Sequence, residues 1–298
     1  MDREKISELL DKSCADALDD WKKGREIDRQ RASEAMTALG DGLKAYIRPD
    51  YDSEYMPPAY VIRYQLGHVY KAWKALSRLK DEMDFGTRGR DTLRIVDFGA
   101  GTSVGRIGAA LMAAEAIEDG RSIDRIFFEE IDTSPLMLGM GTGIWRALTQ
   151  EVQRNFAETA LARAVKIIKG GQNKNWEFIS RDDRDTWLTA FHVTYSDNDD
   201  LKEVINGLYQ SINPIGGAFS CHEGNLERMR EIFPFHPVYE WNSGYYPKHE
   251  GKPNGGVQCS TAHISDWAVK YGFWQNRNMR PYLQVRACAI LVGPDIPF

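Results

Sequence analysis

The sequence has few cysteines, and they are not arranged as in a metal site. Cys14, Cys221, Cys259 and Cys288 lie far apart in the chain, and no CxxC or Cys/His spacing typical of a zinc site is present. Isolated thiols of this kind are typical of a reducing cytoplasm, where they stay free. We therefore expect a cytoplasmic protein without a disulfide framework and without a bound metal.

Long apolar runs and a basic surplus are also absent. No window approaches about 18 consecutive apolar residues, and the N-terminal segment MDREKISELLDKSC is charged, so neither a membrane span nor a secretory signal is predicted. Against 38 Lys and Arg stand 43 Asp and Glu, a net charge of −5. Nucleic-acid-binding proteins usually carry a basic surplus, so this balance disfavours such a partner.

The first part of the 298-residue chain is predicted to be helical. Apolar residues recur at helical spacing within residues 6–21 and 36–47. A third helix is expected to start near Pro58, because proline suits the first turn of a helix. FGTRGRD, residues 85–91, is a glycine-containing break. We therefore predict an N-terminal helical cap over residues 1–90 and a second domain over residues 91–298.

Beyond residue 90, short apolar runs alternate with segments of helical length. This alternation indicates an α/β fold with a mostly parallel sheet and helices on both faces. The last run alternates in part, which favours an antiparallel strand. The predicted strands cover residues 93–98, 125–131, 176–179, 187–193, 217–221 and 282–292.

The first of these strands leads into a loop of small residues, within LRIVDFGAGTSVGR (93–106). Gly99 and Gly101 allow a sharp turn and the close approach of a ligand to the backbone. A helix starts at about Val104, and its free N–H groups point to the same place. Because ligands of open α/β sheets bind at the carboxyl ends of strands, we expect a nucleotide-type ligand there.

Three known loop types compete for this segment. The nicotinamide pattern G-x-G-x-x-G requires glycine where Val104 stands, and Gly105 comes one residue late. The G-K-[ST] of a phosphate-binding P-loop is absent. The segment resembles the first motif of class I S-adenosylmethionine (SAM)-dependent methyltransferases, D/E-x-G-x-G-x-G, with Ser103 in place of the last glycine. That resemblance implies a cofactor site made by Asp97, Gly99, Ala100, Gly101, Thr102 and Ser103.

The second strand strengthens the resemblance. RIFFEEIDTSPLML (125–138) is similar to the D-x-S-P-x-M-L signature that follows strand two in many of these enzymes. The resemblance implies that Asp132 accepts hydrogen bonds from both ribose hydroxyls, with Thr133 and Ser134 beside it. Glu129 and Glu130 are rival carboxylates, on alternate faces of the strand.

The resemblance covers the whole of residues 91–298. It implies a seven-stranded, mostly parallel Rossmann-like sheet, and it places Asp182, which follows the predicted third strand at 176–179, near the adenine amine.

The resemblance also implies the chemistry. SAM carries an activated methyl group, so a base is needed only if the acceptor must lose a proton. Candidates for proton transfer or acceptor positioning are His192 and Tyr195 after strand four, and His222 and Glu223 after strand five. For His192, which lies within an apolar run, packing in the core is the alternative interpretation.

An aromatic segment between strand five and the last helix is a candidate acceptor site. Residues 233–258 hold Trp241, Tyr245 and Tyr246, and a long loop of this kind is often a lid. With Tyr60, Arg63 and Tyr64 of the third helix, these side chains are expected to enclose the acceptor, and Arg63 offers a cation for an anion. The alternative is that the aromatic residues pack the cap against the core.

We expect an enzyme of the EC 2.1.1 type that transfers a methyl group from SAM to an O or N atom of a small molecule or peptide, leaving S-adenosylhomocysteine. YMPPAYVIRYQLGHVYKAW followed by VDFGAGTS also resembles a methyltransferase-like family associated with the small ribosomal subunit. That family carries a metal-binding cysteine cluster, which this chain lacks. The sequence also leaves open an NAD(P)-dependent oxidoreductase and a catalytically inactive SAM-binding module, and the oligomeric state is not predicted.

Overall fold

The computed structural model describes residues 2–45, 49–87, 89–173, 175–191, 198–221, 237–241, 262–275 and 287–292. Three helices come first: α1 (Arg3–Lys22), α2 (Arg29–Ala45) and α3 (Met56–Glu82). The predicted start of the third helix is confirmed, because prolines occupy the first turn of α3. The remaining helices are α4 (Val104–Glu118), α5 (Pro135–Asn155), α6 (Ala160–Ile167), α7 (Asn198–Ile212) and α9 (Ala262–Lys270).

The strands form one sheet in the order β3-β2-β1-β4-β5-β7-β6. They are β1 (Thr92–Phe98), β2 (Arg125–Ile131), β3 (Ile168–Asn173), β4 (Thr186–Phe191), β5 (Gly216–Cys221), β6 (Pro237–Trp241) and β7 (Ala287–Val292). The unbroken parallel part contains the five strands β1–β5, whereas β7 runs antiparallel to both β5 and β6. The prediction of a mostly parallel α/β sheet with an antiparallel last strand is confirmed.

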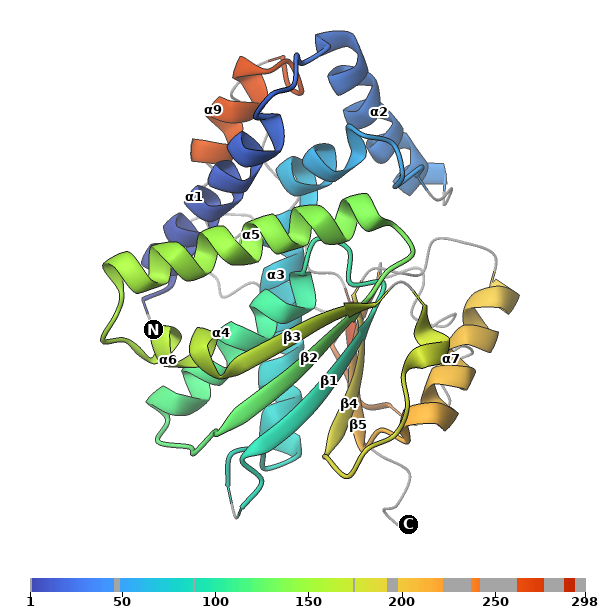
Figure 1. Ribbon diagram of the computed structural model, residues 1–298. Helices are drawn as coiled ribbons and strands as arrows, with labels where there is room; N and C mark the ends of the chain where they lie inside the picture. The colour runs from blue at the N-terminus through green and yellow to red at the C-terminus, as the bar shows by residue number, and fades with distance from the viewer. Residues whose placement is uncertain are drawn as a thin grey trace.

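Helices cover both faces of the sheet (Figure 1). On one face, α3 and α4 pack against each other, α3 also contacts β5 and β7, and the larger apolar core joins both helices to the sheet. Gly108 of α4 allows the contact, because a Cβ there would lie 2.8 Å from the Cβ of Ala72 on α3. On the other face, Ile205 and Leu208 of α7 pack against Val96 and Leu188. The central strands β1 and β4 are therefore buried from both sides, as strands of parallel sheets generally are.

Four further helices gather beyond the ends to which β1, β2 and β3 point. In Figure 1, α5 crosses above these strands, and α1, α2 and α9 lie above α5. Asp11 of α1 fastens α9 in place, because its carboxylate accepts the backbone N–H groups of His263 and Ile264, each at 2.9 Å. Trp267 of α9 donates its indole N–H to Asp19 at 2.9 Å. Helices α1, α2 and α9 therefore lie on the side of the sheet where ligands of such folds bind.

Three details of the predicted strands differ from the structure. The strand predicted at 176–179 is wrong, because Trp176–Phe178 form a short 3-10 helix. The third strand is instead Ile168–Asn173, an edge strand whose residues 169–172 are exposed. Within the predicted lid, Pro237–Trp241 form β6 at the opposite edge of the sheet. Val238, Tyr239 and Trp241 favour a strand there.

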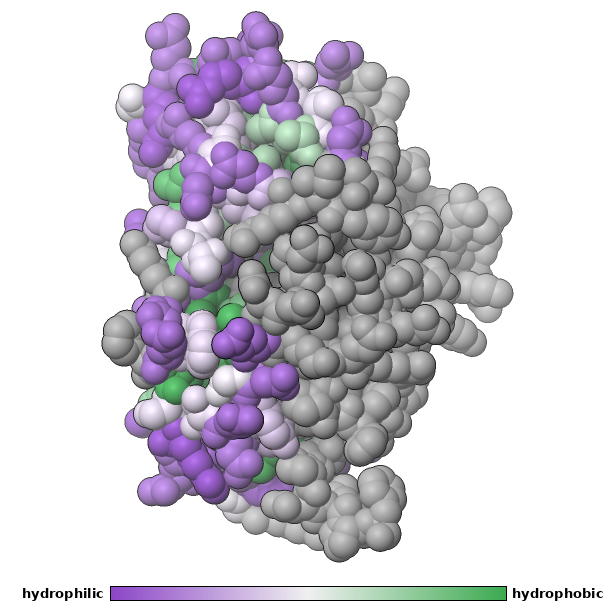
Figure 2. Space-filling view, turned by 90° about the vertical axis from the view of Figure 1, so that its right-hand side faces the viewer, coloured by the Kyte–Doolittle hydropathy of each residue, from purple (hydrophilic) through white to green (hydrophobic). Residues whose placement is uncertain are grey.

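The described surface is largely polar. Figure 2 shows hydrophilic residues over most of the coloured surface, with hydrophobic residues in small patches. Leu136, 41% exposed, is the exposed large hydrophobic residue among those that the structure describes. Within the same residues, no helix combines the length and apolar character that crossing a membrane requires.

Candidate active site

The candidate site lies where the direction of the chain through the sheet reverses. From β1 the chain proceeds outward to β2 and β3, and it then returns to β4 and β5 on the other side of β1. At such a switch point the loops after the strands separate and leave room for a ligand at the carboxyl ends. The loops that follow β1 and β2 therefore form the candidate site.

The loop after β1 is a tight turn of left-handed backbone. Gly99, Gly101 and Ser103 have φ angles of 66°, 52° and 61°. Gly99 and Gly101 are partly exposed, so their backbone can be reached by a ligand. Ala100, Thr102 and Ser103 are buried. Of the predicted cofactor residues in this loop, the two glycines therefore face the open side, and the other three side chains support the turn from inside.

Ser103 is held between the loop and α5. Left-handed backbone costs a residue with a side chain about 1–2 kcal/mol, so surrounding contacts must enforce the conformation. Gly141 of α5 approaches so closely that a Cβ there would lie 2.4 Å from Ser103 Oγ and 2.8 Å from Ser103 N. The departure from the glycine motif at Ser103 is thus matched by a glycine on the neighbouring helix.

Asp132 lies at the tip of β2 with its carboxylate fixed. Its Oδ2 accepts the backbone N–H of Gly101 at 2.8 Å, and its Oδ1 accepts that of Ser134 at 2.8 Å. The carboxylate is partly exposed, and a carboxylate oxygen can accept more than one hydrogen bond. The structure therefore brings together the glycine turn and the predicted ribose-binding acid.

The residues after Asp132 divide between the site and the fold. Thr133 is exposed. Ser134 is buried, and its hydroxyl caps α5 at Met137 N and donates to the carbonyl of Tyr51 at 2.9 Å. Leu136 is exposed near the same end of β2. Ser134 therefore positions the segment, while Thr133 and Leu136 are open to a ligand.

Asp97, the acid at the end of β1, is buried beneath the loop. Thr189 of β4 donates to its Oδ1 at 2.7 Å, and Oδ2 lies so close to Gly105 that a Cβ there would be 2.3 Å away. Burial raises the pKa of Asp97 well above its ordinary value; the Thr189 hydrogen bond opposes this, and Glu130 and Asp132 add to it. Asp97 thus supports the turn from below.

Glu130, one of the rival carboxylates, is buried and lies next to Asp97 on the neighbouring strand. The two residues are paired in the register of β1 and β2, and Glu130 is fully buried. Burial raises the pKa of Glu130, while Ser103, Arg106 and Gln172 oppose the rise. Arg106 lies 3.5 Å from Glu130 and stacks over the Trp145 ring at 4.2 Å. Glu130 thus supports the loop from inside the sheet.

The cap helix α3 is tied directly to the glycine turn. Gln65 donates its amide N–H to the carbonyl of Thr102 at 3.0 Å and also bonds the Thr102 hydroxyl. Sequence reasoning missed Gln65, because nothing in the pattern of α3 indicates a partner 37 residues away.

Tyr60, Arg63 and Tyr64 lie on the same stretch of α3 as Gln65. The hydroxyl of Tyr60 is 2.7 Å from Nδ1 of His68, and the Tyr64 ring stacks on His68 at 5.2 Å. Arg63 donates from Nε to the Tyr64 hydroxyl at 2.8 Å. These predicted acceptor residues therefore form one connected group beside the helix turn that contacts the glycine loop.

Asp182 lies elsewhere. It accepts from Nε of Arg184 at 2.8 Å and lies 3.5 Å from Nη1 of Arg94. Burial acts to raise its pKa, but the hydrogen bonds of Arg184 and the charge of Arg94 lower it overall. Arg94 precedes Asp97 by three residues, about 10 Å along the strand. The structure does not bring Asp182 to Asp132: the strand predicted at 176–179, which Asp182 was expected to follow, is a 3-10 helix, and β3 ends earlier, at Asn173.

The other candidates lie outside the described residues: His192, Tyr195, His222, Glu223, Tyr245 and Tyr246. Trp241 ends β6, and only its backbone is described. Within the residues that the structure describes, no three His, Cys, Asp or Glu side chains are grouped as a metal site requires.

Known proteins resemble the chain only at the level of structure. No family model matches it, and no curated protein matches it. A putative SAM-dependent methyltransferase from Methanococcus maripaludis is 11% identical, covers 84% of this chain and 97% of its own, and gives a TM-score of 0.34. A Haemonchus contortus phosphoethanolamine N-methyltransferase was solved with S-adenosylhomocysteine. It is 12% identical, covers 74% of this chain and 53% of its own, and gives a TM-score of 0.35.

A third structure is the complex between the Haloferax volcanii Trm112 methyltransferase activator and a putative methyltransferase. It is 15% identical, covers 77% of this chain and 92% of its own, and gives a TM-score of 0.34.

Proposed function

We propose that the chain is a SAM-dependent methyltransferase that acts on an O or N atom of a small molecule or peptide. The observation that carries the proposal is Asp132, a partly exposed carboxylate fixed by two backbone N–H groups directly beside the glycine turn. A fixed carboxylate at a strand tip suits the vicinal diol of a ribose, since each oxygen can accept one hydroxyl.

The residues present fit such a cofactor. The backbone of Gly99 and Gly101 is accessible, so the donor can lie close to the turn, and Asp132 holds its ribose. Thr133 and Leu136 flank the ribose-binding acid, and Leu136 offers an apolar surface to a flat ring. When bound, SAM supplies a sulfonium-activated methyl group, so the task of the chain is to align donor and acceptor, which alone contributes about 7–11 kcal/mol.

Two observations disfavour the NAD(P)-dependent alternative. The first is the glycine spacing, with Val104 where the nicotinamide fingerprint requires glycine. The second is the strand order, since the dinucleotide fold continues 3-2-1-4-5-6 in parallel, whereas here the antiparallel β7 separates β5 from β6. Both features are compatible with a mononucleotide-type donor at the β1 switch point.

The acceptor side is part of the same proposal. His192 and Tyr195 follow β4, and His222 and Glu223 follow β5, so all four come after the carboxyl ends of central strands. One of them is proposed to receive a proton where the acceptor must lose one. Residues 1–90, with Tyr60, Arg63 and Tyr64, are proposed to cover the acceptor, in a cytoplasmic enzyme.

Transfer of labelled methyl groups tests the proposal. Purified protein and SAM with a labelled methyl group are incubated with small-molecule and peptide fractions of a cell extract, and label in the acceptor is counted. We expect transfer by the wild type and by Asp124→Asn, an exposed acid at the opposite end of β2, and loss in Asp132→Asn. SAM binding without transfer to any fraction would instead indicate an inactive SAM-binding module.

A further inference from the structure

Arg63 is a partly buried cation without a carboxylate partner among the described residues. Its Nε is used by the Tyr64 hydroxyl. The rest of its guanidinium faces α2 at Gly40, where a Cβ would lie 3.4 Å from both Cζ and Nη2. Buried or half-buried charges are ordinarily paired, because removing them from water is costly. Within the part of the chain that the structure describes, the two Nη groups of Arg63 therefore have no acceptor and can donate to a ligand.

Arg63 lines a hollow between the helical elements of the cap. The hollow has a volume of about 270 Å³ and lies between α2, α3 and residues 273–275, which follow α9. Trp274, only 4% exposed, forms part of its wall. The guanidinium of Arg63 only donates hydrogen bonds and never accepts them. The complementary ligand group is therefore an oxyanion.

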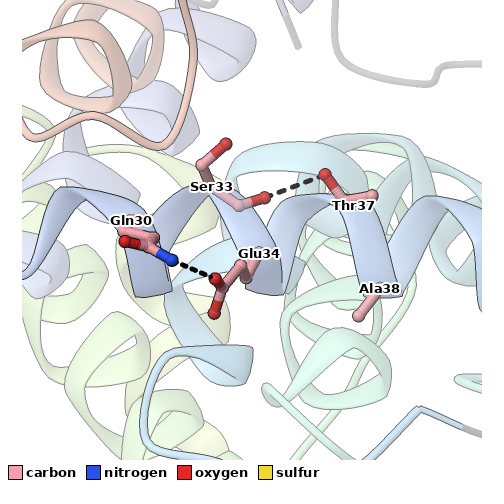
Figure 3. Close-up of a pocket in the computed structure, with 5 residues that line it drawn as sticks. All are labelled: Gln30, Ser33, Glu34, Thr37 and Ala38. Carbon is pink, nitrogen blue, oxygen red and sulfur yellow. Dashed lines mark hydrogen bonds between the residues drawn. The ribbon is translucent and has the colours of Figure 1, made fainter.

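A neighbouring hollow on α2 does not have this character. It measures about 480 Å³ and is lined by Gln30, Ser33, Glu34, Thr37 and Ala38. Figure 3 shows that its polar groups bond to one another: Gln30 donates to Glu34 at 2.9 Å, and Thr37 donates to the carbonyl of Ser33 at 3.0 Å. The residues that the structure describes in its lining include a carboxylate and no cation, so this hollow disfavours an anion and the Arg63 hollow is the better anion site.

The Arg63 hollow is connected to the cofactor loop through one turn of α3. Successive residues of a helix are rotated by about 100°, so Tyr64 lies between Arg63 and Gln65 around the helix. Arg63 bonds Tyr64, and Gln65 bonds Thr102 of the glycine turn. An anion bound at Arg63 thus lies at the same height along α3 as the loop but on the opposite side of the helix, about one helix diameter (~10 Å) away.

We propose that this hollow binds an oxyanion of the methyl acceptor, a carboxylate or a phosphate, and so selects acceptors with an anionic group remote from the methylated atom. The role in acceptor selection rests on the proposed methyltransferase function, whereas the binding of an oxyanion at Arg63 does not depend on it. Asp41, an exposed acid that also lines the hollow, opposes the anion only weakly because solvent screens it.

Binding of simple oxyanions to the full chain tests the proposal. Benzoate and phenyl phosphate are titrated calorimetrically, with benzamide as the neutral match to benzoate. We expect at least one oxyanion to bind and benzamide not to bind. Because hydrogen bonds to charged groups are strong, Arg63→Gln should weaken oxyanion binding at least about tenfold, while Arg63→Lys should retain part of it.

Two further variants sharpen the result. Arg163→Gln, at an exposed position of α6, should leave oxyanion binding unchanged, and Asp41→Asn should strengthen it. Thermal unfolding of each variant confirms that it is folded. Absence of binding by every oxyanion, or equal binding by wild type and Arg63→Gln, would overturn the proposal.

SAM titration of the same samples separates the two hypotheses. SAM binding without oxyanion binding rejects the Arg63 site alone. Arg63-dependent oxyanion binding without SAM binding rejects the methyltransferase function and leaves the anion site standing.

Discussion

Replacing Gly141 by alanine is expected to disturb the glycine turn from behind. The new Cβ would lie 2.4 Å from Ser103 Oγ and 2.8 Å from Ser103 N. Because Ser103 N belongs to the backbone, a rotamer change cannot relieve that contact, and α5 or the turn must move. Overpacking of this kind costs about 1–3 kcal/mol, while glycine-to-alanine replacement within a helix returns about 1 kcal/mol.

Gly139 provides a matched control on the same helix, two residues away. A Cβ at Gly139 meets nothing within 4 Å, so Gly139→Ala should show only the gain in helix propensity, about 1 kcal/mol. The difference in free energy of unfolding between the two variants therefore isolates the packing cost, expected at about 1–3 kcal/mol. Urea unfolding followed by circular dichroism measures it.

The same variants test whether the turn binds the donor. SAM affinity should fall in Gly141→Ala and stay unchanged in Gly139→Ala. Adding Ser103→Gly to Gly141→Ala removes the contact with the hydroxyl and should recover part of the stability, while the contact with the backbone remains. Equal stability of the two alanine variants would refute the close approach of α5 to the turn.

Three further predictions concern stability. Asp11→Ala removes the acceptor of two backbone N–H groups at the start of α9. The free energy of unfolding should fall by about 0.5–2 kcal/mol, and Trp267 fluorescence should report loss of α9 at a lower denaturant concentration than in the wild type. Burial raises the pKa of Asp97, so the stability of the wild type should fall as the pH rises above the ordinary aspartate value. Asp97→Asn should therefore gain stability relative to the wild type when urea unfolding at about pH 8 is compared with that at about pH 4. A stability difference between the two proteins that is the same at both pH values would contradict this. Lys12 bonds Glu151 at 2.5 Å and lowers its pKa, so the stability that this ion pair adds is present above the ordinary glutamate value and is lost on acidification. Lys12→Met should therefore make stability fall less steeply as the pH is lowered. An unchanged fall at low pH would contradict the pairing.

The sequence patterns succeeded where local chemistry decides the structure. β1 and β2 each contain a short apolar run at the centre of the strand, and the glycine turn with Asp132 follows from residue types that few other structures require. β3 could not be found in this way, because IKGGQN has two glycines and exposed polar residues. Its place is decided by pairing with β2. The segment WEFI has the aromatic and branched residues typical of a strand but forms a 3-10 helix over Trp176–Phe178.

The site shows the same division. Glu130 was detectable in part, because strand alternation places it on the same face as the buried Phe128. Its partners Arg106 and Gln172 come from other elements, so their approach depends on tertiary packing. Gln65 and Thr189 likewise act through contacts that join distant parts of the chain. The sequence pattern therefore predicts the acidic residues of the candidate site but not the residues from other elements that hydrogen-bond them.

Calorimetric titration with SAM and S-adenosylhomocysteine tests the central claim most directly, with NADH as the competing ligand. We expect both adenosyl compounds to bind the wild type and Asp124→Asn, and NADH not to bind. Because a hydrogen bond to a charged group contributes about 1.5–3 kcal/mol, Asp132→Asn should bind SAM at least about tenfold more weakly. Binding of NADH in place of SAM, or unchanged SAM affinity in Asp132→Asn, would contradict a donor site built on the glycine turn and Asp132.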